Sequence, residues 1–300
     1  MKLKLRTLVL VALFVVLSTI SVHADTTSAA ITNTTSTAIS VGQQQRLLYK
    51  DLLTDSQQKV YDQILAYVST PGIRKDGGPF SPAEPINWGE LVSIMKAVWG
   101  DHPNEILLYN PEALCRQRRG NILNMNFPCA LHFAMYSDEE YKQMKAAYDE
   151  NIDVACTVIN SKPTFMEKME AINTYVCDKT TYVSDSLLNQ TAWSVFLYGE
   201  SVCAGYSRAT QILCERLGIP CYYVIGYAGK DIRTHENSHA WNVVIDPDGN
   251  PWALDVTWND TNPNGQRQKY FMYPDIYNLP QHELSDESRQ LMDKVLGANQ

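Results

Sequence analysis

The sequence lacks the features that mark several protein classes. Lys and Arg together number 25 against 33 Asp and Glu, and the cluster Arg116, Arg118 and Arg119 is too small to follow a phosphate backbone. No Cys-x-x-Cys pair suggests a zinc knuckle or a redox motif. No apolar run reaches the roughly 18 residues that a membrane-spanning helix needs. We therefore expect no nucleic-acid partner and no membrane contact once the leader is removed.

The longest apolar run lies in residues 1–24, which have the layout of a secretory signal peptide. Lys2, Lys4 and Arg6 precede the run, and Ala24 would end the cleavage site. Cleavage removes three basic residues and no acidic residue, so the formal charge changes from 25 − 33 = −8 to 22 − 33 = −11. An uncleaved anchor is the alternative. We expect an acidic protein that is secreted, periplasmic or held at the cell surface.

The odd number of cysteines bears on both disulfides and reactivity. In an exported protein, seven cysteines predict up to three disulfides and one free thiol. One pairing is disfavoured, because antiparallel helices over 153–159 and 165–177 would place Cys156 and Cys177 about 15 Å apart. The sequence does not choose among the other pairings. The seven are Cys115, Cys129, Cys156, Cys177, Cys203, Cys214 and Cys221.

The pattern along the chain then predicts a spacer and a helical region. Residues 25–42 are rich in Thr, Ser and Ala, carry almost no charge and predict a flexible spacer. Residues 43–160 are predicted to be mostly helical, because apolar residues recur with the helical period. Within this region we expect helices over 43–67, 88–99 and 138–160, loop over 76–87, and extended chain over 121–136.

Residues 161–300 are predicted to combine helices with an antiparallel sheet. The helical period covers 163–177 and 202–217, and the sequence Gly-Ile-Pro ends the second helix. Strands are expected at 221–226, 239–245 and 252–256, with an Asp248-Gly249 turn joining the last two into a hairpin. A helix followed by antiparallel strands indicates an α+β fold.

Cys203 stands at the predicted start of the 202–217 helix. Unpaired backbone N–H groups and the positive end of the helix dipole favour a thiolate at such a position. The same N–H groups could hold the oxyanion that forms when a carbonyl is attacked. Gly199 and Gly205 are expected to leave room for a substrate backbone.

A cysteine nucleophile also needs a base and a group that orients the base. His239 lies about nine residues before the hairpin turn and Asp255 about seven after it, so we expect them to be near neighbours across the ladder. Asp255 would fix the imidazole tautomer while His239 pairs with Cys203. Taken singly, each residue is more often a packing or capping residue. The three together, in this order and on these elements, are much harder to explain in that way.

Four separated motifs resemble the core of the transglutaminase-like superfamily. They are Gly-x-x-Val-Cys-x-Gly-Tyr around Cys203, Leu-Gly-Ile-Pro at 217–220, His-Ala-Trp at 239–241 and Trp-Ala-Leu-Asp-Val-Thr-Trp at 252–258. The resemblance implies a papain-like core within 161–300, with Cys203 as nucleophile, His239 as base and Asp255 as orienting residue. The helical N-terminal region resembles, more weakly, a prefix of secreted bacterial members. Members include transglutaminases, peptidases, peptide N-glycanases and inactive binding modules, so the resemblance does not fix the substrate.

Two competing interpretations share parts of this site. Residues 235–239 read His-Glu-Asn-Ser-His, a match to the His-Glu-x-x-His motif of zinc proteases, which requires a helix. The β-prone run after His239 instead predicts a loop that leads into a strand. An inactive binding module would lack a member of the triad, and none is missing.

The expected activity is that of a secreted cysteine-dependent amide or peptide-bond enzyme that forms a thioester, most simply a peptidase or amidase. An amine acceptor in place of water would make it a protein transglutaminase, and the sequence does not decide between them. Trp193, Tyr182 and Gln190 could supply a side-chain donor to the oxyanion. Core packing is the first expectation for Trp193 and Tyr182, and a solvated loop for Gln190. The expected partner is a protein or peptide substrate, and no metal or organic cofactor is implied.

Overall fold

A computed structural model describes residues 46–69, 80–104, 115–125, 137–186, 188–230, 232, 237–262 and 266–297. The predicted signal peptide and spacer lie outside these residues, as do parts of the 76–87 and 121–136 segments. The division at 160 and 161 stays a prediction. Among the described residues, no helix is both long and apolar enough to cross a membrane.

Four helices begin with the same local device, a capping box. A Thr, Asn or Ser side chain accepts a hydrogen from the backbone N–H three residues later, and the Gln or Glu at that position bonds back. The four are α1 (Asp55–Val68), α3 (Trp88–Asp101), α5 (Asp138–Asn160) and α6 (Phe165–Lys179). The helices predicted over 88–99, 138–160 and 163–177 are therefore confirmed within two residues at each end.

The prediction of one helix over 43–67 is wrong in part. A short 3-10 helix, η1 (Tyr49–Leu52), precedes α1 and is separated from it by Leu53 and Thr54. The break occurs because Thr54 adopts an extended backbone and caps α1, which starts a new helix there. A hairpin of β1 (Cys115–Arg118) and β2 (Asn121–Met125) follows α3, so the extended chain predicted after residue 121 is confirmed as far as Met125.

The main sheet has four antiparallel strands in the order β7-β6-β5-β8. Its strands are β5 (Cys221–Ala228), β6 (Ser238–Ile245), β7 (Pro251–Leu254) and β8 (His282–Leu284). The predicted hairpin is β6–β7, and the predicted α+β class is confirmed. A smaller parallel pair, β3 (Thr181–Tyr182) and β4 (Glu200–Ser201), comes directly before the helix that carries Cys203.

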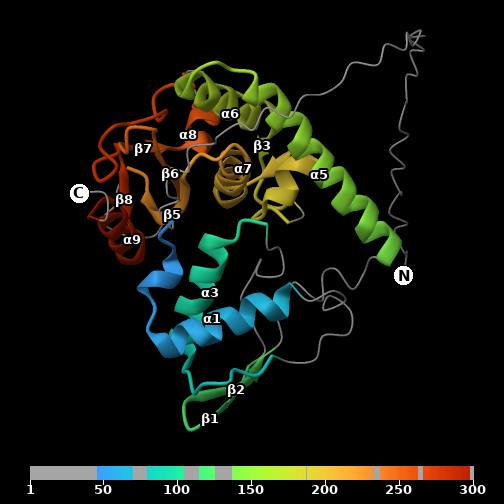
Figure 1. The fold of residues 1–300 in the computed structure, drawn as a ribbon, viewed down its shortest axis with the longest axis vertical. Coiled ribbons are helices and arrows are strands. Elements are labelled where there is room, and N and C mark those ends of the chain that lie inside the picture. The colour runs from blue at the N-terminus through green and yellow to red at the C-terminus, as the bar shows by residue number, and fades with distance from the viewer. Residues whose placement is uncertain are drawn as a thin grey trace, which may run out of the picture. The chain divides into compact units, whose positions relative to one another are not determined.

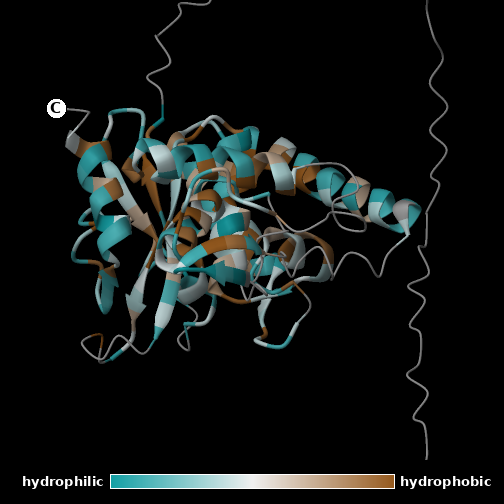
Figure 2. Ribbon diagram, turned by 90° about the horizontal axis from the view of Figure 1, so that it is seen from below, coloured by the Kyte–Doolittle hydropathy of each residue, from teal (hydrophilic) through white to brown (hydrophobic). Residues whose placement is uncertain are grey.

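That helix, α7 (Cys203–Arg216), is the centre of the core. It packs against β6 and β5 on one side and against α6 and α5 on the other, as Figure 1 shows. Most of its residues are buried, and the Asn242 side chain of β6 donates a hydrogen bond to the Ser207 carbonyl at 3.0 Å. In Figure 2 the apolar residues gather where helices meet the sheet. Burial from all sides holds the first residue of α7 in a fixed place.

The N-terminal elements η1 and α3 are fixed to β5 and α7. The Arg208 guanidinium of α7 lies 4.4 Å from the ring centre of Trp99 and 4.7 Å from that of Tyr223, and it donates to the Trp99 carbonyl at 2.6 Å. The Tyr49 hydroxyl is 3.0 Å from the Tyr223 carbonyl and 2.8 Å from the hydroxyl of Ser288 in α9 (Asp286–Gly297). These contacts place α3 and η1 beside the strand that borders Cys203.

The expected set of up to three disulfides is not supported. Five cysteines are free thiols, so Cys203 is not the single one. Cys156 and Cys177 are unpaired, as their predicted separation requires. Cys129 and the side chain of Cys115 lie outside the described part of the chain. The free thiols are Cys156, Cys177, Cys203, Cys214 and Cys221.

Candidate active site

The helix that carries Cys203 begins without a side-chain cap. Its N-cap residue, Val202, has an extended backbone and makes no capping hydrogen bond. The N–H groups of Gly205 and Tyr206 bond to the Val202 carbonyl, whereas those of Cys203 and Ala204 have no acceptor within the helix by their position. The half-buried Cys203 therefore stands at the positive end of α7 beside backbone donors.

Gly205 and Gly199 serve packing rather than substrate entry, so that expectation is wrong. A Cβ on Gly205 would lie 1.9 Å from the Ser201 hydroxyl oxygen and 2.8 Å from the Thr191 carbonyl oxygen. Gly199 has φ +69°, and a Cβ there would lie 2.9 Å from the Lys179 carbonyl oxygen. The two glycines let the chain before α7 close tightly against its first turn, which positions Cys203.

His239 is the second residue of β6 and is only 8% exposed. Cys203 packs against a small buried cluster that includes Tyr223 and Ala240, the residue that follows His239. The imidazole has two indole rings as neighbours, with centroid distances of 5.9 Å to Trp241 and 5.8 Å to Trp258. Cys203 is also among the causes that raise the pKa of His239, which puts the thiol within electrostatic reach of the imidazole.

Asp255 was expected in a strand over 252–256, but β7 ends at Leu254. Asp255 is instead the N-cap of the short helix α8 (Val256–Asp260), and its Oδ1 accepts the backbone N–H of Trp258 at 3.1 Å. Its Oδ2 lies 2.9 Å from Nε2 of His239. The structure thus brings together the three residues predicted from the sequence.

Charge and burial act against each other in this pair. Burial raises the pKa of Asp255, but His239 and His282 outweigh it and hold that pKa well below its usual range. Burial lowers the pKa of His239, but the charge of Asp255, the hydrogen bond that His239 donates to it and the influence of Cys203 raise that pKa to about 10. Asp255 is therefore ionised and His239 is protonated at neutral pH.

A second histidine, His282 of β8, was missed by the sequence analysis. Its Nε2 lies 3.0 Å from the same Oδ2 of Asp255, and its Nδ1 lies 2.9 Å from the carbonyl oxygen of Pro280. No motif surrounds this residue. The pairing of β8 with β5, which brings it here, joins segments more than fifty residues apart.

His239, Asp255 and His282 also form the one group in the described part of the chain that could offer three ligands to a metal ion, with ligand atoms within 4.8 Å of one another. As they are arranged, Oδ2 of Asp255 accepts hydrogen bonds from both imidazole Nε2 atoms. A cation would have to displace both of those protons. We therefore describe the group as a hydrogen-bonded cluster.

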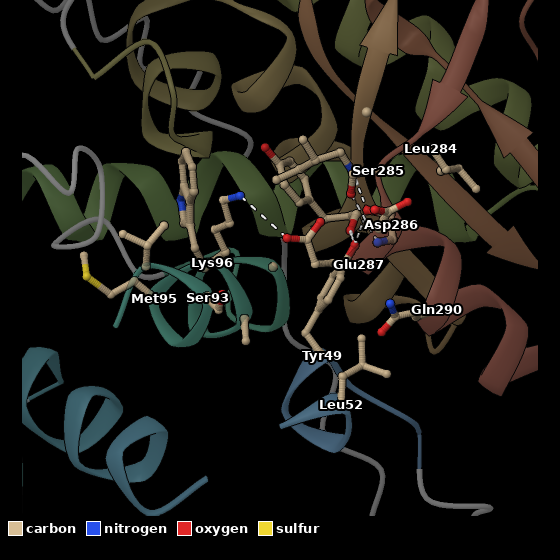
Figure 3. A pocket seen from close by; sticks show the side chains of 18 of the residues that line it. Tyr49, Leu52, Ser93, Met95, Lys96, Leu284, Ser285, Asp286, Glu287 and Gln290 are labelled. Carbon is tan, nitrogen blue, oxygen red and sulfur yellow. Dashed lines mark hydrogen bonds and ion pairs between the residues drawn. The ribbon is translucent and has the colours of Figure 1, made fainter. Parts of the chain in front are cut away.

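A cavity of about 790 Å³ adjoins residues that pack with the nucleophile, but Cys203, His239 and Asp255 are not among the residues that line it. Tyr223 and Ile225 line it, and the same two residues pack with Cys203 in the small cluster. Figure 3 shows that η1 and α3 form one wall, through Tyr49, Leu52 and Met95, while β8 and α9 form the other. The N-terminal elements thus enclose a space that reaches the residues around the thiol.

Among the described residues that line this cavity, acidic side chains outnumber basic ones. Glu283, Asp286 and Glu287 line it together with one cation, Lys96, whose Nζ lies 3.8 Å from a Glu287 carboxylate oxygen. The dashed line between Lys96 and Glu287 in Figure 3 marks this ion pair. A cationic group would therefore be favoured in the cavity over an anionic one.

The three residues considered as oxyanion donors have different surroundings. Trp193 is buried, with ring centroids 4.8 Å from Tyr148 and 5.9 Å from Tyr141, so its predicted packing role is confirmed. Tyr182 is 46% exposed, so the prediction that it packs in the core is wrong. Burial and, next in order, the charge of Cys203 raise the pKa of Tyr182, which places its hydroxyl in the electrostatic reach of the thiol. Gln190 is half-buried in a turn.

The helix that the zinc-protease motif requires does not form. Ser238 and His239 are the first residues of strand β6, and consecutive strand side chains point to opposite faces. His235 and Glu236 lie outside the described residues. The motif therefore loses the helical spacing that would place both histidines on one face.

The family model for the transglutaminase-like superfamily matches residues 152–256. Residues 152–256 form a transglutaminase-like domain. This domain begins in α5, contains α7 and the β6–β7 hairpin, and includes all three predicted site residues. Its family supports a cysteine-dependent enzyme as the setting for Cys203. His282 lies beyond the matched residues.

Solved structures that are similar to part of this chain include the following three. A candidate cysteine protease from Cytophaga hutchinsonii is 26% identical over 37% of this chain and 37% of its own, with TM-score 0.32. A TGase is 17% identical over 49% and 44%, with TM-score 0.32. The periplasmic domain of TgpA from Pseudomonas aeruginosa, bound to ethylmercury, is 16% identical over 41% and 48%, with TM-score 0.33.

The chain matches less than half of the length of each of these three proteins. Among curated proteins, none matches it significantly. The assignment of the transglutaminase-like domain therefore rests on the family match and on the arrangement of α7 with the sheet.

Proposed function

We propose that this chain is a cysteine-dependent amide-bond hydrolase that acts on protein or peptide substrates outside the cytoplasm. The observation that carries the proposal is the hydrogen bond between Asp255 and His239, together with the packing of Cys203 against Ala240 and the influence of Cys203 on the pKa of His239. These residues come from the β7–α8 junction, from β6 and from the start of α7. A buried carboxylate, an imidazole and a thiol in series are what a thiol acyl-transfer site requires.

The two nitrogens of His239 have separate roles in this proposal. Nε2 is taken by Asp255, so Nδ1 is the nitrogen that serves Cys203. The pKa of His239, raised to about 10, keeps the ring positively charged at neutral pH. A cation next to a thiol favours the thiolate, which is the nucleophilic form.

In the first half-reaction, the Cys203 sulfur forms a bond to the substrate carbonyl carbon, and the carbonyl electron pair moves to oxygen. The free N–H groups at the start of α7 stabilise that oxyanion. His239 gives its Nδ1 proton to the leaving amine as the C–N bond breaks, which leaves a thioester. In the second half-reaction His239 takes a proton from water, the hydroxide adds to the thioester, and the C–S bond breaks to release the acid.

The cavity lined by Tyr223 and Ile225, which both pack with Cys203, supports a protein or peptide substrate. Its volume of about 790 Å³ and its mixture of tyrosine, aliphatic and acidic side chains suit several residues of an extended chain. Because η1 and α3 form one wall, the N-terminal region contributes to substrate choice in this proposal. The site therefore depends on both halves of the chain.

Transamidation is the second candidate function. The excess of acidic residues, Glu283, Asp286 and Glu287 against Lys96, favours a cationic amine such as a lysine side chain close to the thioester. Such an amine would replace water as the acceptor and give an isopeptide bond. Hydrolysis is proposed first because water needs no binding site.

The test incubates the purified protein with casein and a fluorescent primary amine, and compares wild type with Cys203→Ala. We expect casein fragments from wild type and none from the variant. Cys156→Ala is the matched control, because Cys156 is another partly buried free thiol on α5, and this variant should keep full activity. Incorporation of the amine without cleavage would favour the second candidate function.

Two further treatments separate the thiol mechanism from its competitors. In a Cys156→Ala background, iodoacetamide should abolish activity at the rate at which Cys203 is alkylated, and a chelator should have no effect. Activity that survives alkylation and disappears with the chelator would refute the proposal. A properly folded protein that neither turns over substrate nor reacts with iodoacetamide would be a binding module.

A further inference from the structure

His282 is buried in an aromatic enclosure behind the proposed triad. Its side chain is 1% exposed, and its ring centroid lies 4.4 Å from that of Trp258, 5.0 Å from Trp241 and 5.7 Å from Tyr270. The backbone enters β8 through Gln281, which has φ +63°. A polar ring enclosed by three aromatic side chains needs hydrogen-bond partners to offset its burial.

Those partners hold the ring of His282 at both nitrogens. The Pro280 carbonyl oxygen can only accept, so Nδ1 donates to it at 2.9 Å. Nε2 donates to Oδ2 of Asp255 at 3.0 Å. With one nitrogen held by the Pro280 carbonyl, the other is directed at the carboxylate, and the surrounding aromatic rings pack against the imidazole.

Among the described residues, three groups donate hydrogen bonds to the Asp255 carboxylate, which is fully buried. Oδ1 accepts from the Trp258 backbone N–H at 3.1 Å, while Oδ2 accepts from both His239 and His282. Burial raises the pKa of Asp255, and the hydrogen bond and charge of His282 are among the causes that lower it. One of these donors, His239, transfers a proton in the proposed mechanism. The other side-chain donor, His282, takes no part in that transfer.

We propose that His282 is a positioning residue that fixes Asp255 and keeps it ionised when His239 has given up its proton. This inference rests on the proposed function. His239 loses its positive charge when it protonates the leaving amine, and the buried carboxylate then loses its main counter-charge. The hydrogen bond from His282 persists through that stage. The carboxylate therefore stays in place, and His239 keeps Nδ1 towards Cys203.

The test compares two amide replacements, with kcat and KM measured on the peptide substrate. In His282→Gln the amide nitrogen takes the place of Nε2 and reaches Asp255, whereas in His282→Asn it takes the place of Nδ1 and reaches only Pro280. We expect kcat to fall about 10- to 100-fold in His282→Asn, the range seen when an outer partner is removed. His282→Gln should stay within about tenfold of wild type. KM should change little in either.

A double-mutant cycle separates positioning from packing. If His282 acts through Asp255, His282→Leu should cost nothing further in a protein that already carries Asp255→Ala. Losses that multiply, or equal activity of His282→Asn and His282→Gln, would overturn the inference. Near-ultraviolet circular dichroism checks that each variant is folded, and the Gln and Asn variants decide the question if His282→Leu does not fold.

The outcome is distinguishable from a failure of the proposed function. If wild type and Cys203→Ala are equally active, the thiol mechanism fails. If Cys203→Ala is inactive and all His282 variants match wild type, the thiol mechanism stands and only the role of His282 fails.

Discussion

His239 and Asp255 are joined by a hydrogen bond of 2.9 Å although they do not face each other in the β6–β7 ladder. The last paired residues are Asn242 and Leu254, so continuation of the register sets Asp255 beside Trp241, two positions from His239. Residues so related lie on the same face of a sheet as diagonal neighbours. The contact forms because the chain leaves the strand at Asp255 and turns into α8.

Replacement of Asp255 by Asn should lower kcat and move the alkaline limit of activity. The reaction needs a protonated His239, whose pKa is raised to about 10, so wild-type kcat/KM should fall above roughly pH 10. Without the carboxylate that raises this pKa, the limit should shift to lower pH, towards the ordinary histidine value of about 6.5. Loss of the tautomer control should reduce kcat about 10³- to 10⁴-fold.

The control for this prediction is Asp248→Asn, which makes the same change at an exposed position in the turn of the same hairpin. It should leave both kcat and the pH profile unchanged. The measurement is kcat/KM from pH 5 to roughly pH 11. An alkaline limit that stays in place in Asp255→Asn would show that Asp255 does not set the protonation of His239.

A bulky side chain at Ser93 should obstruct the cavity. Ser93 is an exposed residue of α3 that lines the cavity wall opposite β8 and α9, so Ser93→Trp should fold normally. We expect KM for a peptide substrate to rise roughly tenfold, about 1.4 kcal/mol, with kcat nearly unchanged. Val154→Trp, on an exposed part of α5, is the control. Equal KM values in the two variants would exclude the cavity as the substrate site.

The hydroxyl of Tyr182 should assist the oxyanion. Tyr182 is exposed on β3, and the charge of Cys203 contributes to the rise in its pKa. Tyr182→Phe keeps the ring and removes the donor, so kcat should fall up to about a hundredfold with KM unchanged. Tyr277→Phe, which loses a hydrogen bond to Asp293 outside the site, should have wild-type kcat. A Tyr182→Phe enzyme with full kcat would assign the oxyanion to the backbone N–H groups alone.

Local signals explain what could be predicted about the helices. The boxes Thr54 with Gln57, Ser137 with Glu140 and Thr164 with Glu167 each use residues three apart, so neighbouring residues are enough to start the helix. The prediction of a single helix over 43–67 is wrong because the apolar period continues across Thr54. Thr54 caps α1, so two separate helices, η1 and α1, form in this segment.

Site residues whose role depends on their neighbours in the sequence could be predicted. A residue that reaches the site only through the pairing of distant strands could not. Cys203 at a helix start and His239 in a strand follow from nearby residues. The role of Asp255 as a cap of α8 depends on where β7 ends. His282 has no motif, and only the addition of β8 to the edge of β5 brings it to Asp255.

The sequence by itself determined the helices, the hairpin and the order of thiol, imidazole and carboxylate, because capping, apolar periodicity and turn residues act over a few positions. The tertiary structure decided which groups touch. It placed two histidines against Asp255 in place of one and filled the space around Gly205 with protein atoms. It also left Tyr182 exposed and made α3 a wall of the cavity that Tyr223 and Ile225 line. Such contacts join residues far apart in the chain, and the packing of the whole core fixes them.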